Sequence, residues 1–153
     1  MPDMLVRLYA LPDHNTILKE GYVVRRAAAY DKSVLLQWIS QHFSAQWASE
    51  VDVAFSRQPI SCVIALYHET LAGFGCYEAT CRGFFGPGGV LEAHRGQGLG
   101  TVLLLECLRS MKEMGYAYAI IGGVGPKAFY VKTVGAIEIP DSTPGIYTIP
   151  IKP

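Results

Sequence analysis

Apolar residues recur along the first third of the chain with two different spacings. Residues 5–11 and 22–26 are short, mostly apolar runs of the length typical of strands. From Asp31, a residue type that caps helices well, apolar positions repeat every three or four residues to about Phe43. Over residues 44–56 they repeat every four. This part of the sequence predicts two short strands followed by two helices.

The middle of the chain changes to strand-type patterns. Residues 60–67 are a continuous apolar run, and residues 71–80 form a partner strand after a short turn. Residues 84–92 have strand composition too, but Pro87 and the neighbouring glycines favour a bulged or splayed strand over a regular ladder. We therefore expect a meander whose last strand leaves an opening in the sheet.

The last third alternates helix and strand patterns. Residues 98–114 form the clearest amphipathic helix, which Gly115 ends. A buried-type strand over residues 117–121 follows, Pro126 begins a short helix, and residues 137–151 supply a final strand or hairpin. This order of elements predicts an α/β fold with a mixed sheet and a helix that crosses between strands.

Length and charge narrow the functional classes. The 153 residues suit a single domain over 1–153, with residues 1–21 as an N-terminal extension that holds a short strand. Thirteen basic and 13 acidic residues balance, which argues against a nucleic-acid partner. No run reaches the roughly 18 to 20 apolar residues of a membrane span, so we expect no membrane partner and a cytoplasmic protein.

The cysteines and histidines do not form a metal-binding motif. The four cysteines are scattered without a Cys-x-x-Cys pair, and the four histidines lie far apart. We expect reduced, mostly buried thiols and no metal; the cysteines are Cys62, Cys76, Cys81 and Cys107.

A glycine-rich loop over residues 95–100, Arg-Gly-Gln-Gly-Leu-Gly, connects an apolar strand to the long helix. Unpaired N–H groups and the positive end of a helix dipole make such a helix start an anion site. The glycines let the backbone approach a phosphate closely, and Arg95 adds a charged donor. The loop therefore predicts a phosphate-bearing ligand, which we favour over a tight turn without one.

Two familiar phosphate loops do not fit this segment. A P-loop would need Gly-Lys-Ser or Gly-Lys-Thr at its end, whereas Thr101 follows Gly100. A dinucleotide-binding fingerprint would need Gly-x-Gly-x-x-Gly early in the chain, whereas these glycines are evenly spaced and lie two-thirds along it.

The loop resembles a third type of motif. Arg-x-x-Gly-x-Gly between a strand and a long helix, matched by Arg95, Gly98 and Gly100, is similar to the acetyl-CoA signature of the GNAT acetyltransferase superfamily. The resemblance extends through a Phe-Tyr-Val-Lys segment at residues 129–132 and covers residues 22–150. It implies a centrally splayed sheet of about six to seven strands flanked by about four helices.

The resemblance also implies acetyl-CoA as the cosubstrate. The strand before the loop would pair with the pantetheine arm, the loop would hold the pyrophosphate, and the cofactor would enter the gap in the sheet. The implied cofactor residues are Val90, Leu91, Arg95, Gly96, Gln97, Gly98, Leu99, Gly100, Thr101 and Phe129.

The implied chemistry is attack of a neutral amine on the thioester. Tyr130 matches the family tyrosine that protonates the departing thiolate. Glu50, Glu78 and Glu92 are candidate bases, and His94 is a weaker one. Two departures stand out in this sequence. Gly123 replaces an asparagine common in the family, and one extra residue separates Tyr130 from Gly135.

The resemblance indicates the acceptor substrate less directly than the cofactor. Residues placed where family members form the acceptor pocket are Trp47, Glu50, Phe55, Arg57, Phe84 and Phe85. Aromatics with a carboxylate suit the primary amine of a small molecule, such as an amino sugar, a polyamine or an amino acid. A non-catalytic acyl-CoA-binding module and a protein N-terminal or lysine acetyltransferase are the alternatives, and homodimers are common in the family.

Overall fold

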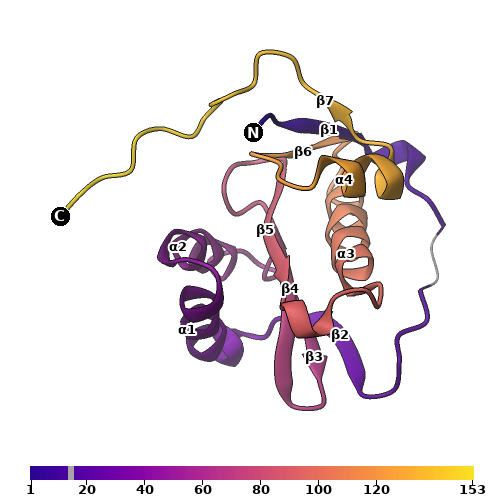
Figure 1. Ribbon diagram of the computed structural model, residues 1–153, viewed down its shortest axis with the longest axis vertical. Helices are drawn as coiled ribbons and strands as arrows, with labels where there is room; N and C mark the ends of the chain where they lie inside the picture. Colours follow the sequence, from indigo (N-terminus) through magenta and orange to yellow (C-terminus); the bar gives the residue numbers. More distant parts are fainter. Residues whose placement is uncertain (14–15) are drawn as a thin grey trace.

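The structure is a computed structural model and describes residues 1–13 and 16–153. Within them, one seven-stranded sheet runs in the order β2-β3-β4-β5-β6-β1-β7 (Figure 1). Among the strands that the structure describes, β5 and β6 alone pair in parallel. The strands are β1 (Met4–Arg7), β2 (Tyr22–Arg26), β3 (Cys62–Tyr67), β4 (Thr70–Tyr77), β5 (Phe84–Val90), β6 (Tyr118–Ile121) and β7 (Ile137–Glu138).

Helices cover both faces of this sheet. The helix pair α1 (Lys32–His42) and α2 (Ala45–Ala54) packs on one face, and α3 (Leu99–Glu113) packs on the other beside α4 (Lys127–Val134) (Figure 1). Short 3-10 turns precede or follow these elements at η1 (Leu8–Ala10), η2 (Ala29–Asp31) and η3 (Glu92–His94). The mixed α/β sheet expected from the sequence is confirmed.

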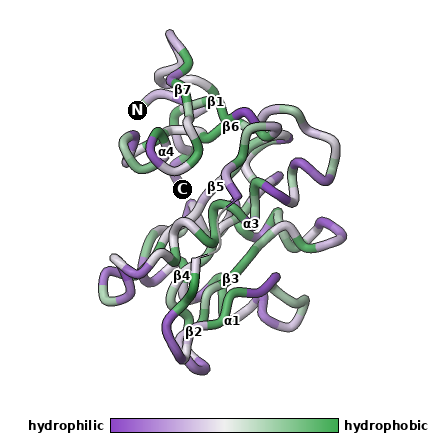
Figure 2. The backbone as a smooth tube through the Cα atoms, turned by 90° about the vertical axis from the view of Figure 1, so that its right-hand side faces the viewer, coloured by the Kyte–Doolittle hydropathy of each residue, from purple (hydrophilic) through white to green (hydrophobic). Residues whose placement is uncertain are grey.

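The strands divide their side chains between two cores. On β3, Val63 and Ala65 face the core under α3, whereas Cys62 and Ile64 face the core under α1 and α2. This alternation follows from the two-residue period of a strand, and it explains why the run 60–67 is apolar throughout. Figure 2 shows the hydrophobic residues concentrated in these central strands and in α3.

The sheet splays open between β5 and β6. These strands pair at two positions only, Phe84 with Ile120 and Phe85 with Ile121, and then separate. At the point of separation Gly86 adopts a left-handed φ of 122°, which favours glycine, and the β4–β5 register shifts. The predicted splayed strand is therefore confirmed, and the rest of β5 keeps one edge free of strand pairing.

The C-terminal prediction was wrong in its extent. We expected a strand or hairpin over residues 137–151, but β7 has two residues, and it pairs with β1. The edge of β6 is occupied by β1, from Met4 opposite Ile121 to Arg7 opposite Tyr118, so β7 pairs with the outer edge of β1. The chain after β7 runs on without a strand (Figure 1). Prolines, which donate no backbone hydrogen bond, recur along it.

The N-terminal strand is also shorter than predicted. Residues 5–11 were expected to be extended, but the strand covers Met4–Arg7 and the chain turns into η1 directly after it. Leu8 is fully buried in the core under α3, so the turn is held by packing. The strand of the N-terminal extension is thus an inner strand of the sheet.

Candidate active site

A cavity of about 450 Å3 follows the open edge of β5 and reaches the start of α3, a size typical of a small-molecule site. We name it the glycine-loop cavity. Apolar side chains of α3 and α4 line it together with the backbone of the loop. Its lining includes Phe74, Phe85, Gly88, Gly89, Val90, His94, Arg95, Gly96, Gly98, Leu99, Gly100, Thr101, Leu103, Leu104, Pro126, Phe129 and Tyr130.

The glycine loop borders this cavity with its backbone. Gly96 and Gly98 have left-handed φ values of 78° and 85°, conformations that favour glycine. Leu99 begins α3, and the bond from Val102 N–H to the Gly98 carbonyl is the first of the helical series. The N–H groups of the first turn therefore have no helical acceptor, and with the helix dipole they create a partial positive charge.

The backbone of β5 directs polar groups toward its open edge. Leu91 N–H already donates to the Ala72 carbonyl of the neighbouring strand, at 2.9 Å. Because successive residues of a strand point their polar groups to opposite edges, Val90 directs its own toward the cavity. Arg95 reaches the same place, since its Nε donates to the Val90 carbonyl at 3.1 Å. The Val90 carbonyl therefore already accepts from Arg95, and Leu91 N–H is bonded to the neighbouring strand, so the pairing of these residues with a ligand stays a prediction.

A hydrogen-bonded cluster supports the loop from behind. Tyr22 Oη lies 2.7 Å from His94 Nδ1, and Gln97 Nε2 donates to the same hydroxyl at 3.0 Å. Gln97 therefore fixes the loop to β2, and it is absent from the cavity lining. Tyr22 lies far from the loop in sequence, so no local pattern could assign it this supporting position.

Tyr130 lies in the first half of α4, at the inner end of the glycine-loop cavity. It is half-buried, and its ring packs edge-on against Phe129 and Phe85, with centroid separations of 5.1 and 6.4 Å. Burial raises the pKa of the Tyr130 phenol above its ordinary value, so the hydroxyl keeps its proton at neutral pH. The extra residue before Gly135 is accommodated because Gly135, with a φ of 64°, ends the helix.

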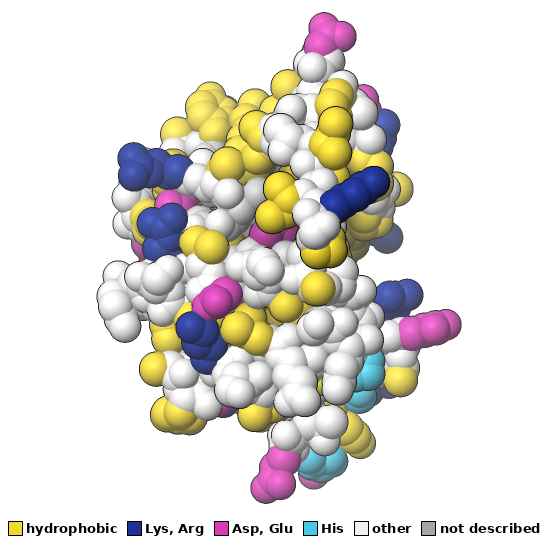
Figure 3. Space-filling model, turned by 90° about the vertical axis from the view of Figure 1, so that its left-hand side faces the viewer, with side chains coloured by type: hydrophobic (Ala, Val, Ile, Leu, Met, Phe, Trp, Pro, Cys, Tyr) yellow, Lys and Arg dark blue, Asp and Glu magenta, His cyan; other side chains and the backbone are white. Residues whose placement is uncertain are grey.

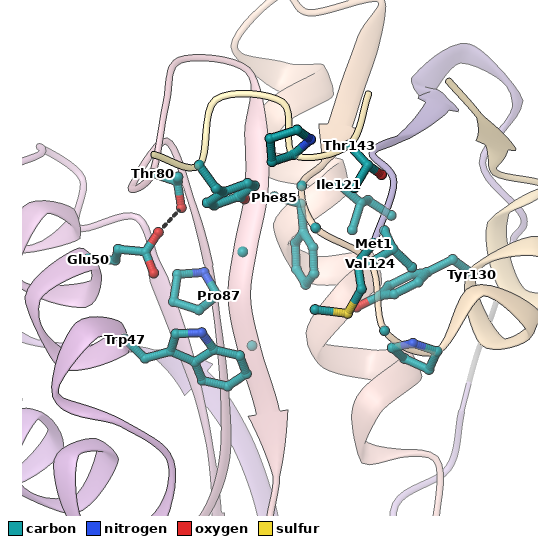
Figure 4. Close-up of a pocket in the computed structure, with 18 residues that line it drawn as sticks. Met1, Trp47, Glu50, Thr80, Phe85, Pro87, Ile121, Val124, Tyr130 and Thr143 are labelled. Atoms are coloured by element: carbon teal, nitrogen blue, oxygen red, sulfur yellow. Dashed lines mark hydrogen bonds between the residues drawn. The ribbon is translucent and has the colours of Figure 1, made fainter. Parts of the chain in front are cut away.

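A second cavity, of about 540 Å3, opens toward α2 (Figure 4). We name it the α2 cavity. Trp47 and Glu50 of α2 form one wall, the bulged part of β5 forms the floor, and Tyr130 lies across from them (Figure 4). Its lining is Met1, Trp47, Glu50, Thr80, Phe85, Gly86, Pro87, Gly88, Ile121, Gly122, Gly123, Val124, Gly125, Pro126, Tyr130, Thr143, Pro144 and Tyr147.

The two cavities meet at the splay. Four residues line both, namely Phe85, Gly88, Pro126 and Tyr130. A ligand that follows β5 from the glycine loop would therefore reach Tyr130 at its inner end, and a second ligand could approach the same point from the α2 side. Such an arrangement suits transfer of a group between two molecules, because both can be held in contact at once.

The sequence profile of the family described as "Acetyltransferase (GNAT) family" matches residues 25–135. This match covers most of the chain and includes β5, the glycine loop, α3 and α4. The chain belongs to the GNAT acetyltransferase family. No curated protein matches the sequence.

Solved GNAT structures share the fold at low sequence identity. A GCN5-related N-acetyltransferase from Sphaerobacter thermophilus has a TM-score of 0.70 and 18% identity over 90% of this chain and 48% of its own. A GNAT family acetyltransferase from Brucella melitensis in complex with acetyl-CoA has a TM-score of 0.56 and 19% identity, over 72% of this chain and 82% of its own. A GNAT family N-acetyltransferase from Escherichia coli in complex with CoA has a TM-score of 0.58 and 23% identity, over 78% of this chain and 71% of its own. The chain spans about half or less of the first three structures it matches.

The residues predicted for the acceptor pocket of this GNAT chain separate into two groups. Trp47, Glu50 and Phe85 line the α2 cavity. Phe55 packs into the core under α1 and α2, and the Arg57 side chain is exposed after α2. Phe84 is absent from both linings, although it lies beside Phe85, because neighbouring side chains on a strand point to opposite faces.

Two of the predicted bases, Glu78 and Glu92, are absent from the linings of both cavities. Glu78 directly follows β4, is 3% exposed and has a positive φ of 57°. Its Oε1 accepts from Gly83 N–H at 2.6 Å, so the carboxylate holds the β4–β5 turn together. The other candidate, Glu92, is exposed at the start of η3. Of the carboxylates considered from the sequence, the structure brings Glu50 alone to a cavity that Tyr130 lines.

Sequence reasoning missed the C-terminal contribution to the α2 cavity. Asp3 holds it in place: its N–H donates to Ser142 Oγ at 2.8 Å, and its Oδ1 accepts from Gly123 N–H at 2.9 Å. The segment then brings Tyr147 against the glycines after β6, where an added Cβ at Gly123 would lie 3.3 Å from the ring. Nothing local in the sequence signals this, because all three contacts join distant parts of the chain.

The cysteines lie outside both cavities. Burial raises the pKa of the Cys76 and Cys107 thiols well above the ordinary value, so both stay protonated and unreactive. Among residues 1–13 and 16–153, no three or more His, Cys, Asp or Glu gather as a metal site. None of the helices described there is long and apolar enough to cross a membrane.

Proposed function

We propose that this chain transfers the acetyl group of acetyl-CoA to the primary amine of a small molecule, in a complex that holds both substrates. The observation that carries the proposal is the meeting of the glycine-loop cavity and the α2 cavity at Tyr130. A catalyst of direct transfer needs its acid at the point where both substrates meet, and the presence of Tyr130 in the lining of both cavities supports that role.

The cofactor would lie along the glycine-loop cavity. The pyrophosphate would accept hydrogen bonds from the N–H groups of residues 96–100, at the positive end of α3. Arg95 would add charge at the same place, and the free edge of Val90 would pair with the amide groups of the pantetheine arm. Two GNAT neighbours carry acetyl-CoA or CoA, which supports this ligand for the present chain.

The chemical step balances with groups near Tyr130. The amine nitrogen attacks the thioester carbonyl carbon, a C–N bond forms, and the C–S bond breaks. The Tyr130 phenol gives its proton to the departing CoA sulfur, and the attacking nitrogen loses one proton to a carboxylate or to solvent. A Gly88 N–H directed to the free edge of β5 would stabilise the oxyanion, because that residue lines both cavities.

The proposal is tested by calorimetric titration of acetyl-CoA, followed by assay of thiol release over a panel of primary amines. Arg95→Glu should abolish binding, whereas Arg57→Glu, an identical charge reversal at an exposed residue outside both cavities, should leave it unchanged. Absence of binding by the wild type would refute the proposal. Binding without thiol release from any amine would instead favour a non-catalytic acyl-CoA-binding module.

A further inference from the structure

We infer that Tyr22 of β2 is a positioning residue for the cofactor: its hydroxyl fastens the glycine loop at His94 and Gln97, so that the loop meets acetyl-CoA already in its binding conformation. This inference rests on the proposed function and goes beyond it, because Tyr22 lines neither cavity. Tyr22 thus acts on binding through the loop and not through contact with the ligand.

The two hydrogen bonds of the Tyr22 hydroxyl enclose a short stretch of the loop. Tyr22 Oη lies 2.7 Å from His94 Nδ1 and accepts from Gln97 Nε2 at 3.0 Å. Between these two fastened points lie Arg95 and Gly96. We name this arrangement the Tyr22 clamp. It sets the course of the chain between the end of β5 and the start of α3.

The direction of these hydrogen bonds fixes which nitrogen of the imidazole ring carries a proton. The side-chain amide nitrogen of Gln97 only donates, so the Tyr22 oxygen is its acceptor. The hydroxyl proton is then directed to His94 Nδ1, which lies 2.7 Å away. A neutral imidazole whose Nδ1 accepts carries its proton on Nε2. The Tyr22 clamp therefore predicts a single tautomer for His94, a signature that does not depend on any ligand.

Ring packing and strand pairing hold the hydroxyl in this position. The ring centroid of Tyr22 lies 4.7 Å from that of Tyr67 on β3 and 5.6 Å from that of His94, which it meets edge-on. The rings of Tyr67 and His94 also lie 5.6 Å apart, so the three rings form one cluster. Tyr22 is half-buried and pairs with Tyr67 in the sheet. A regular strand therefore carries the clamp, and not another loop.

The loop needs such a support because of its glycines. Gly96 and Gly98 have left-handed φ values of 78° and 85°, and a free glycine samples many other conformations. A loop that its ligand must first order loses affinity by the entropy of ordering the backbone. The chain has no net positive charge to offset this loss. On the face drawn in Figure 3, the described basic and acidic side chains are interspersed without a continuous basic area.

The experiment titrates acetyl-CoA by calorimetry into the wild type, Tyr22→Phe and Tyr67→Phe. Tyr22→Phe removes both hydrogen bonds of the Tyr22 clamp and keeps the ring. We expect its Kd to rise by about five- to thirtyfold through a less favourable binding entropy, the cost of ordering about one residue of backbone. Tyr67→Phe is the matched control, because the Tyr67 hydroxyl makes no hydrogen bond within the described part of the chain. It should bind acetyl-CoA as the wild type does.

Three further measurements separate positioning from general support of the fold. In the thiol-release assay at saturating acetyl-CoA, Tyr22→Phe should keep the kcat of the wild type, while KM for acetyl-CoA rises. Imidazole nitrogen NMR, with the signal assigned through His94→Gln, should show the Nε2–H tautomer in the wild type and a mixture in Tyr22→Phe. Gln97→Ala breaks the same clamp from the loop side, so it tests the inference even if Tyr22→Phe does not fold. It should raise Kd similarly, and the double variant should add little to either single change.

A wild-type Kd for Tyr22→Phe or Gln97→Ala would overturn the inference, and so would an equal loss of affinity in Tyr67→Phe. A fall of kcat in place of a rise of KM, a mixture of tautomers in the wild type, or changes in Kd that multiply in the double variant would overturn it as well. In each of these cases the proposed function stands, provided that the wild type binds acetyl-CoA and releases thiol. If the wild type does not bind acetyl-CoA, the proposed function fails, and this inference fails with it.

Discussion

Gly100→Ala separates the stability of the glycine loop from its proposed role in binding. Gly100 lies in the first turn of α3, and an added Cβ would lie 3.7 Å from Phe129 Cζ and 4.0 Å from Val90 Cγ2. These are ordinary van der Waals contacts, so the methyl group fits without displacing its neighbours. Alanine also favours a helix over glycine by about 0.5 to 1 kcal/mol. The variant should therefore unfold at the same urea concentration as wild type, or at a higher one.

The same methyl group should weaken acetyl-CoA binding. It would lie between Phe129 and Val90, across the cavity along which we place the cofactor. If it keeps the pyrophosphate from one backbone N–H, the loss of a charge-assisted hydrogen bond costs about 1.5 to 3 kcal/mol, or about ten- to a hundredfold in Kd. Calorimetric titration measures this directly, and urea unfolding of the same sample measures stability.

Gly125→Ala is the matched control. An added Cβ there meets nothing within 4 Å, and Gly125 lines the α2 cavity but not the glycine-loop cavity. It should bind acetyl-CoA as wild type does. A wild-type Kd for Gly100→Ala would refute the placement of the pyrophosphate on this loop. A lower free energy of unfolding would refute the packing argument.

Three further predictions concern the acid, the turn and the thiols. Tyr130→Phe should lower kcat in the thiol-release assay by about a hundredfold or more with an unchanged Kd for acetyl-CoA. Because burial raises the pKa of the Tyr130 phenol, the phenol should deprotonate, and the activity of the wild type should fall, only above about pH 10. An unchanged kcat in Tyr130→Phe would contradict the role of Tyr130 as the acid. Glu78→Ala should cost about 1.5 to 3 kcal/mol in urea unfolding, because the bond to Gly83 N–H is lost. The exposed control Glu92→Ala should cost less than about 0.5 kcal/mol, and equal costs would argue against the turn role. Half-buried Cys81 should react with a maleimide first, while buried Cys107 stays unmodified until the chain unfolds, as followed by mass spectrometry. Equal rates for the two thiols would contradict their assigned burial.

Elements with a clear period were predicted well. The helix of α3 needed only its own apolar spacing and Gly115, and the splay of β5 needed only Pro87 and its glycines. The glycine loop was found for the same reason, since its left-handed residues and helix start are local features. The loop residues Arg95, Gly96, Gly98 and Gly100 all line one cavity, as the local pattern led us to expect.

Local sequence patterns did not predict in which direction side chains point at the ends of helices and strands. Glu78 stands in a strand-like run, and the resemblance made it a candidate base. In the structure a left-handed φ turns Glu78 to bond Gly83 within the β4–β5 turn. The prediction for Arg57 depended on the end of α2 in the same way, and the exposed side chain lies outside both cavities. One residue of difference at the end of an element is enough to reverse such an assignment.

The sequence by itself determined the alternation of strands and helices, the opening in β5 and the glycine loop at the start of the long helix. Each of these depends on neighbours within a few residues, which periodicity and glycine content reveal. Only the tertiary structure decided that β1 enters the sheet beside β6, which leaves the C-terminal segment free to bring Tyr147 to the α2 cavity. It alone also placed Glu50 opposite Tyr130. Those positions depend on which edge a strand occupies and which distant segments pack together. Such choices are fixed by the packing of the whole chain, so local spacing does not record them.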